Sequence, residues 1–250
     1  MKILITNDDG IYADGLYSLY RQLKKVGDCL VVAPDGQKSS VGHGITLNTP
    51  LWCKKIHRKG KLFGYAVSGT PADCVKFGVS VLLKSPPDVI VSGINLGDND
   101  GCSVFYSGTV AGAREGALLG IPSMAVSLAT FVDPDYEFAA QCAAKLVKKM
   151  KRNSIPRGTF LNVNVPAKPV SRTKGIRMTK QGMDPIHGYF HKRQDPHGHE
   201  YYWLSGKPPF KLKADNSDTI TLRQNFVTVT PIHVDSTDYV TLEALQDWKF

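Results

Sequence analysis

The first two thirds of the chain alternate short runs of apolar residues with segments whose apolar residues recur at helical spacing. Runs such as "KILIT" and "DVIVSG" are typical of buried strands, whereas "DGLYSLYRQLKKVG" places its leucines on one face of a helix. The predicted strands are residues 2–6, 29–34, 88–93, 123–128 and 159–166, and the predicted helices are residues 14–27, 69–83, 109–120 and 136–150. Continuous apolar strands separated by helices predict an α/β fold whose mostly parallel sheet is covered on both faces.

The pattern changes after Pro166. Residues 167–215 are rich in Lys, Pro, Gly, His and aromatic residues and contain no clear helix, so they are expected to form a hairpin arm that projects from the sheet. Residues 226–232 return to a strand pattern, and residues 238–248 predict a closing helix. The arm is too short to have an evident core of its own, which favours one domain over residues 1–250 with the arm as an appendage used in oligomerisation.

The composition is that of an ordinary globular protein with an excess of positive charge. The formal net charge is +9, which favours anionic partners such as nucleic acid or small phosphorylated molecules. The basic residues are dispersed, so steering of small anions is expected rather than stable nucleic-acid binding. The five cysteines are scattered and include no C-x-x-C pair, and no segment is long and apolar enough to span a membrane. These features favour a cytoplasmic protein without a zinc site or a disulfide framework.

Polar residues follow three of the predicted strands at their carboxyl ends, where ligands bind in open parallel sheets. Asp8 and Asp9 come directly after the first strand, and Gly10 would let the chain turn so that both carboxylates approach one point. The next two strand ends are followed by oxygen-rich loops that contain Ser39, Ser40, His43 and Asn95. One interpretation is a metal site, because two close carboxylates repel unless a cation or a shared proton lies between them. The alternative is that these side chains only cap the following helix.

The candidate ligand atoms are carboxylate, hydroxyl and amide oxygens, which suit Mg²⁺, Mn²⁺ or Ca²⁺ better than Zn²⁺. Spacing does not choose between Ser39 and Ser40 as the hydroxyl ligand. The segment "YSGTVAG" at 106–112 offers Ser107 and Thr109 hydroxyls at a helix start, where backbone N–H groups attract phosphate. A cation beside an anion-binding helix end suggests phosphoryl transfer or phosphate-ester hydrolysis.

Several motifs in order resemble the survival protein SurE family of metal-dependent 5'- and 3'-nucleotidases. They are "ILITNDDG", "VVAPDGQKSS", "GTPADCVKFGV", "PDVIVSGINLGDN" and "YSGTVAGAREGALLGIPSMAVSL", and the resemblance extends to "VTVTPIHVDSTDY" near the end of the chain. It implies a Rossmann-like, three-layer α/β fold with a C-terminal β-hairpin arm that serves in homodimers or homotetramers. It also implies hydrolysis of nucleoside monophosphates, and it leaves open whether 3'-phosphates or short polyphosphate are cut as well.

Residue by residue, the resemblance implies one divalent cation per subunit, Mg²⁺ or Mn²⁺, held by Asp8, Asp9, Ser39 and Asn95. The family's phosphate-contacting segment corresponds to Ser107, Gly108 and Thr109, and Asn7 and His43 match positions near the site. Asn7 is therefore expected to help bind substrate. Asp8, Asp9, Asn95 and His43 are the expected catalytic residues, with Asp9 and His43 as alternative bases for the attacking water.

Two other functions fit part of the pattern. A phosphoaspartyl enzyme would use one of the two carboxylates as a nucleophile, but the D-x-D spacing of dehalogenase-type phosphatases is absent. A non-catalytic nucleotide- or nucleic-acid-binding protein would explain the net charge of +9. In the arm, the H-x-H at His197 and His199 lacks an evident third metal ligand, and the aromatic run 201–203 suits either base stacking or a subunit contact.

Overall fold

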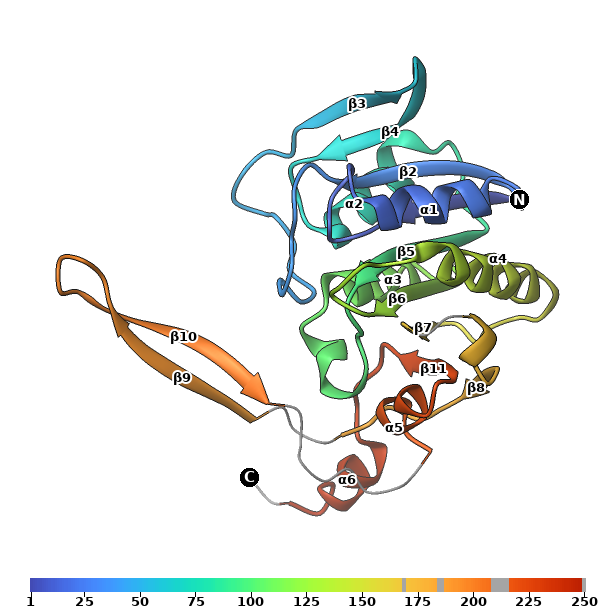
Figure 1. Cartoon of the computed structure of the whole chain (residues 1–250). Helices are drawn as coiled ribbons and strands as arrows, with labels where there is room; N and C mark the ends of the chain where they lie inside the picture. The colour runs from blue at the N-terminus through green and yellow to red at the C-terminus, as the bar shows by residue number, and fades with distance from the viewer. Residues whose placement is uncertain (168–169, 184–186, 208–215, 249–250) are drawn as a thin grey trace.

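The structure is a computed structural model that describes the whole chain except residues 168–169, 184–186, 208–215 and 249–250 (Figure 1). Its strands are β1 (Lys2–Thr6), β2 (Asp28–Pro34), β3 (Cys53–Arg58), β4 (Lys61–Val67), β5 (Val89–Leu96), β6 (Ser123–Ala129), β7 (Thr159–Pro166), β8 (Ile176–Met178), β9 (His187–Gln194), β10 (Glu200–Lys207) and β11 (Val227–His233). Its α-helices are α1 (Asp14–Leu23), α2 (Pro71–Phe77), α3 (Gly108–Leu118), α4 (Tyr136–Arg152), α5 (Asp218–Arg223) and α6 (Tyr239–Ala244). All six strands and all five helices predicted from the sequence are present.

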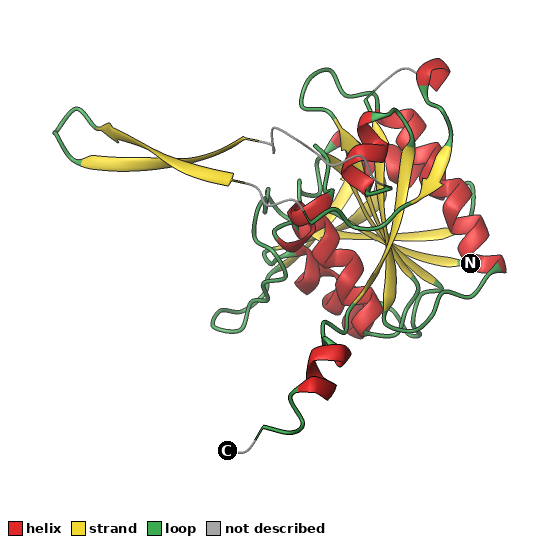
Figure 2. Ribbon diagram, turned by 90° about the horizontal axis from the view of Figure 1, so that it is seen from below, coloured by secondary structure: helices red, strands yellow, loops and turns green. Residues whose placement is uncertain are grey.

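Within the described residues, nine strands form one sheet in the order β3-β4-β2-β1-β5-β6-β7-β11-β8. Neighbouring strands from β4 to β7 are parallel, whereas β3 and β11 run antiparallel to β4 and β7. Helices lie on both sides of the sheet (Figure 2). The predicted α/β fold with a mostly parallel, doubly covered sheet is confirmed. No helix in the described part of the chain is long and apolar enough to cross a membrane.

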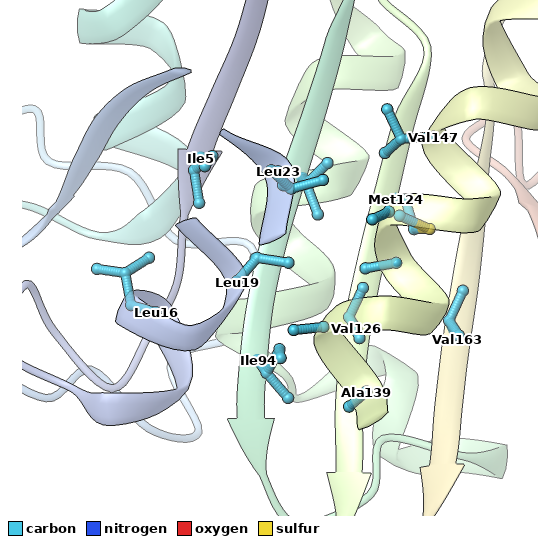
Figure 3. Close-up of a cluster of buried hydrophobic side chains, with 14 of the residues drawn as sticks. Ile5, Leu16, Leu19, Leu23, Ile94, Met124, Val126, Ala139, Val147 and Val163 are labelled. Atoms are coloured by element: carbon cyan, nitrogen blue, oxygen red, sulfur yellow. The ribbon is translucent and has the colours of Figure 1, made fainter. Parts of the chain in front are cut away.

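The main core lies between the sheet and the helices α1 and α4. Leu16, Leu19 and Leu23 of α1 are fully buried and belong to the same cluster as Met124 of β6 and Val163 of β7 (Figure 3). The leucines recur at intervals of three and four residues, so they lie on one face of the helix and are removed from water together. Burial of such side chains is worth roughly 1.5–3 kcal/mol each, which makes this face the main source of stability for α1.

On the other side of the sheet, α2 and α3 place the functional loops. The α2 helix begins with a capping box in which Thr70 and Asp73 satisfy each other's backbone N–H groups, and Pro71 occupies its first turn. Asp73 also accepts hydrogen bonds from the Thr46 backbone N–H at 3.1 Å and from the Thr46 hydroxyl at 2.6 Å. The long connection between β2 and β3 is thereby fastened to the start of α2. The α-helix ends at Phe77 and continues as a π-helical turn, so the predicted helix over 69–83 consists of two pieces.

Four elements were not predicted from the sequence: β3, β4, β8 and α5. The β3–β4 hairpin forms one edge of the sheet, and most side chains of β3 are exposed, so the strand lacks the apolar pattern of its neighbours. The short strand β8 and the helix α5 lie at the other edge, next to β11. An edge strand pairs on one side only and is often polar, so its pattern resembles that of a loop.

The predicted arm is present as the hairpin β9–β10, which projects from the sheet (Figures 1 and 2). Within the range 167–215 that the sequence assigns to the arm, Ile176–Met178 pairs with β11 in the main sheet, so the projecting hairpin itself spans His187–Lys207. β1 and β11 share one sheet although they lie near opposite ends of the chain, and we therefore interpret residues 1–250 as one domain.

Candidate active site

The candidate site lies where the order of the parallel strands reverses. The chain leaves β1 for β2 on one side, while β5 pairs with β1 on the other, so a crevice opens beyond the carboxyl ends of β1 and β5. A cavity of about 670 Å³ lies at this edge. The described residues that line it are Asp8, Ser39, Ser40, Asn95, Leu96, Gly97, Asp98, Asn99, Ser103, Tyr106, Ser107, Phe131, Gly188, Leu204 and Gly206.

Asp8 is a buried carboxylate that lines this cavity. Its side chain is 4% exposed, and its Oδ1 accepts a hydrogen bond from the Thr109 hydroxyl of α3. Burial raises the pKa of Asp8 to about 6, the Thr109 hydrogen bond opposes this shift, and the neighbouring Asp9 adds to it. A buried carboxylate whose charge is so poorly compensated is a common feature of functional sites.

Asp9 lies beside Asp8 but is not among the residues that line the cavity. It is partly buried, and its Oδ2 accepts a long hydrogen bond of 3.4 Å from the Leu96 N–H at the end of β5. Burial raises the pKa of Asp9 as well. Among the described residues, no Lys, Arg or His forms an ion pair with either carboxylate. The two acids therefore form a negatively charged pair without a cationic side chain to balance it.

The Asn7 side chain, which was expected to help bind substrate, is bonded to the backbone of Gly10. Its side chain is fully buried, donates from Nδ2 to the Gly10 carbonyl at 3.0 Å and accepts from the Gly10 N–H at 3.2 Å. Gly10 has a φ of +99°, which a residue with a side chain rarely adopts. Asn7 and Gly10 thus hold the turn that carries Asp8 and Asp9. The amide of Asn7 is engaged in this turn, and Asn7 is not among the described residues that line the cavity, so its role in substrate binding stays a prediction.

Asn95 and Ser39 both reach the cavity from the neighbouring loops. The Asn95 amide nitrogen donates to the carbonyls of Leu96 and Gly97 at 3.3 and 2.8 Å, which leaves the amide oxygen as the group that can serve a ligand. Ser39 is exposed, and its hydroxyl oxygen accepts a hydrogen bond from the Gln37 amide at 2.9 Å. Ser40 lines the same cavity, so the lining alone does not choose between the two serines.

The start of α3 borders the site. Ser107 caps the helix by accepting from the Val110 N–H at 3.1 Å, so its hydroxyl hydrogen is free to donate into the cavity. Gly108 lies so close to Asp8 that a Cβ there would be 2.8 Å from the Asp8 Cβ, which explains why this position has no side chain. Thr109 is fully buried, and its hydroxyl donates a hydrogen bond to the Asp8 carboxylate. Within the predicted phosphate segment, Ser107 therefore faces the cavity and Thr109 orients the carboxylate.

His43 does not line the cavity. Its Nε2 lies 2.9 Å from Oε2 of Glu115, a carboxylate of α3 that is 2% exposed, and Lys76 of α2 contacts the other carboxylate oxygen at 2.7 Å. Despite the opposing effect of burial, the hydrogen bonds and charges of His43 and Lys76 lower the pKa of Glu115. His43 thus fastens the loop that carries Ser39 to α2 and α3. This contact favours a positioning role over the catalytic role expected from the sequence.

Comparison with known proteins identifies the family. The sequence model described as "Survival protein SurE" matches residues 3–187. The chain belongs to the SurE family. A protein of Syntrophobacter fumaroxidans named "5'-nucleotidase SurE" is 44% identical over 249 residues, covering 100% of both chains. Another of that name from Syntrophus aciditrophicus is 47% identical over 247 residues, covering 98% of this chain and 93% of the relative.

A solved structure supports the same assignment. The crystal structure of the SurE protein from Aquifex aeolicus matches with a TM-score of 0.87 at 38% sequence identity, over 98% of each chain. The family predicted from the sequence motifs is confirmed, and so is the Rossmann-like arrangement that the resemblance implied.

The donor groups at the SurE-family site fit a hard divalent cation. Within the described part of the chain, no group of three or more His, Cys, Asp or Glu side chains is placed to hold a metal. A cation at this edge would therefore combine the Asp8 and Asp9 carboxylates with hydroxyl and amide oxygens, a ligand set that suits Mg²⁺ or Mn²⁺. The uncompensated carboxylate pair is the structural observation that favours such an ion.

Two features of the SurE-family cavity were missed from the sequence. Asn99 is buried and holds the wall in place: its backbone N–H donates to Asn164 at 2.8 Å, and its amide donates to Ser127 at 2.9 Å. The alternation of Asn and Val in "NVNVP" of β7 is the signal that could have indicated buried polar partners. Phe131 also lines the cavity, from the loop after β6. The strand-end rule that selected the other loops applies to this loop too.

Proposed function

We propose that this chain is a 5'-nucleotidase, a phosphoric monoester hydrolase that needs one divalent cation to cleave nucleoside 5'-monophosphates into nucleoside and phosphate. The observation that carries the proposal is the buried Asp8 carboxylate, paired with Asp9 at the strand reversal and adjacent to the start of α3. The names of the full-length relatives support the same activity. The cytoplasmic location of this protein stays a prediction from the sequence.

In this proposal the cation is Mg²⁺ or Mn²⁺, held by Asp8, Asp9, Asn95 and Ser39. When bound, it supplies neutralisation of the phosphoryl charge and a lower pKa for a coordinated water. The family resemblance selects Ser39, whereas the cavity exposes both Ser39 and Ser40.

The protein's own groups bind and orient the substrate. The Ser107 hydroxyl donates to a phosphoryl oxygen, and the positive end of α3 favours the anionic group there. Thr109 fixes the direction of the Asp8 carboxylate by its hydrogen bond. The Asn95 amide oxygen is kept free because its nitrogen is held by two backbone carbonyls. These interactions place the phosphate ester without a Lys or Arg among the described residues that line the cavity.

The proton of the attacking water needs an acceptor, and Asp9 is the better of the two candidates. Asp9 follows Asp8 at the end of β1, and its Oδ2 accepts a long hydrogen bond of 3.4 Å from the Leu96 N–H, so its carboxylate remains available to a proton. The His43 ring is engaged by the Glu115 carboxylate of α3, so we assign it to positioning of the Ser39 loop.

The proposal includes a homodimer or homotetramer built through the arm. Both faces of the β9–β10 hairpin carry exposed apolar side chains: Phe190 pairs across the strands with Leu204, and Trp203 lies on the opposite face. A two-stranded sheet has no core in which to bury them, so a second copy of the chain is the expected cover.

The test is phosphate release from the four common nucleoside 5'-monophosphates, 3'-AMP and tripolyphosphate, each with Mg²⁺, with Mn²⁺ and with excess chelator. We expect release from the 5'-monophosphates that needs Mg²⁺ or Mn²⁺ and stops in chelator. Full activity in chelator, or strict dependence on Zn²⁺, would contradict the all-oxygen site. Nucleotide binding without release from any substrate would favour the non-catalytic alternative, and a trapped phosphoaspartate would favour the phosphoaspartyl one.

A further inference from the structure

Phe131 presents a large apolar ring to water at the edge of the candidate active site. The side chain is 74% exposed, although it lines the same cavity as Asp8, Asn95 and Ser107. An isolated exposed aromatic residue needs no explanation, but one that faces a cavity with buried functional groups is available to a ligand.

The position of this ring is determined by local structure. The Thr130 backbone N–H donates to the Leu128 carbonyl at 2.7 Å, and the Thr130 hydroxyl donates to the Val132 carbonyl at 2.8 Å and accepts from the Val132 N–H at 3.1 Å. The tip of the ring rests on Gly97, where a Cβ would come within 2.5 Å of the Phe131 Cζ. The Gly97 N–H in turn donates to the Leu128 carbonyl at 2.9 Å. The ring is thus supported at its edge by the ends of β5 and β6.

The chemistry of the surrounding wall restricts what could lie against the ring. Tyr106 and Leu204 add exposed apolar surface to the same cavity, whereas Asp98 adds a carboxylate. Among the described residues that line the cavity there is no Lys, Arg or His. A second anionic group, such as a further phosphate, would find no cationic side chain among the lining residues that the structure describes. A flat and neutral group matches this wall better.

We infer that Phe131 is a specificity-determining residue that stacks on the nucleobase of the substrate. The inference rests on the proposed nucleotidase function and adds to it the part of the substrate that the cavity recognises. The phosphate lies at Ser107 and the start of α3, and the base lies against the Phe131 ring. The enzyme therefore selects nucleoside monophosphates over phosphate esters that lack a base.

The experiment compares AMP with ribose 5-phosphate, which shares the sugar and the phosphate but has no base. In Phe131→Ala, kcat/KM for AMP falls about tenfold or more, because stacking of one base on an aromatic side chain is worth this much. For ribose 5-phosphate, kcat/KM stays within about twofold of the unmodified enzyme. Phe131→Tyr retains the preference for AMP. Val132→Ala is the matched control, because Val132 is 73% exposed on the same turn and does not line the cavity.

An unchanged ratio of kcat/KM between the two substrates in Phe131→Ala would overturn the inference, whether both values fall equally or neither falls. So would a change of oligomeric state on size-exclusion chromatography with the ratio intact. The last result would assign the ring to a subunit contact. If the unmodified protein releases phosphate from neither ester, the proposed function fails. Calorimetric binding of AMP to the unmodified protein and to Phe131→Ala then tests the stacking role by itself. Weaker binding to Phe131→Ala supports the stacking role, and equal binding refutes it.

Discussion

The carboxyl edge of the sheet and the β9–β10 hairpin depart from the usual distribution of side chains in opposite directions. At the sheet edge, Asp8 and Thr109 are polar groups removed from water, and burial raises the pKa of Asp8 to about 6. In the hairpin, Trp203 and Leu204 are apolar groups left in water. A buried carboxylate without a cationic partner and an exposed apolar surface are both unfavourable in the isolated chain. In our proposal, a cation and substrate relieve the first at the sheet edge, and a second subunit covers the second at the hairpin.

The largest expected effect concerns the carboxylate pair. Asp8→Asn and Asp9→Asn keep the shape of the side chain and remove one charge, so metal affinity falls and phosphate release drops by at least about 100-fold. The metal-free variants are at least as stable as the unmodified protein, because the repulsion between the two carboxylates is relieved. Phosphate release and the metal-free melting temperature measure both effects. Near-normal hydrolysis in both variants would reduce Asp8 and Asp9 to the capping role, since Asn caps as well as Asp.

The next prediction removes the exposed apolar surface. Gly188 and Gly206 are cross-strand partners near the base of the hairpin, so residues 189–205 can be replaced by a short turn between them. The shortened chain is expected to move toward the monomer on size-exclusion chromatography. Arg193→Ser, which changes only an exposed polar residue of β9, should leave the assembly unchanged. If the oligomer persists after the deletion, the hairpin is not required for assembly, and a second subunit does not account for its exposed apolar side chains.

A smaller effect is expected at His43. Because His43 acts through Glu115 as a positioning residue, changing His43 to Asn should lower kcat/KM by about tenfold or less. The shape of the pH–rate profile should be retained. Loss of a general base costs roughly 10²–10⁴-fold and removes the limb of the profile that reports its titration. Glu115→Gln should resemble His43→Asn, because the two side chains form one contact. A loss of 10²-fold or more with an altered profile would restore His43 to catalysis.

The smallest effect concerns Asp100, which follows Asn99 in the cavity wall. Burial, with Asp98 and Asp218 nearby, raises the pKa of Asp100 to about 7 from the ordinary 3.8. The folded state therefore keeps this proton to higher pH than the unfolded state, and its contribution to stability is lost as pH rises from about 4 to 7. Asp100→Asn should raise the free energy of unfolding at pH 8 by on the order of 2 kcal/mol and leave it unchanged at pH 4.

Denaturant unfolding at the two pH values measures this difference. Asp133→Asn, at an exposed position of the loop after β6, is the control. An equal effect of Asp100→Asn at both pH values would show that charge is not the cause.

The fold, and the meeting of Asp8, Ser39, Asn95 and Ser107 at one cavity, could be predicted because both follow from local patterns. Continuous apolar runs mark the parallel strands, and the rule for strand ends selects Asp8, Asp9 and Asn95 without knowledge of any contact. The partner of His43 could not be found in this way, because Glu115 lies 72 residues further along the chain and only the packing of the β2–β3 connection against α3 brings them together. The β3 strand escaped prediction because an exposed edge has no apolar pattern. Asn7 was assigned to substrate because its position near the acids is visible in the sequence, whereas its bonds to Gly10 are not.

The most direct test of the account is Mn²⁺ binding to the unmodified chain and to Asp8→Asn, measured by calorimetry at pH 7.5 on the same samples that are assayed for phosphate release. The account predicts one ion per unmodified chain, greatly weakened binding in Asp8→Asn, and a parallel loss of hydrolysis. Equal Mn²⁺ binding and equal hydrolysis in the two proteins would contradict the claim that the buried carboxylate at the strand reversal holds the catalytic cation.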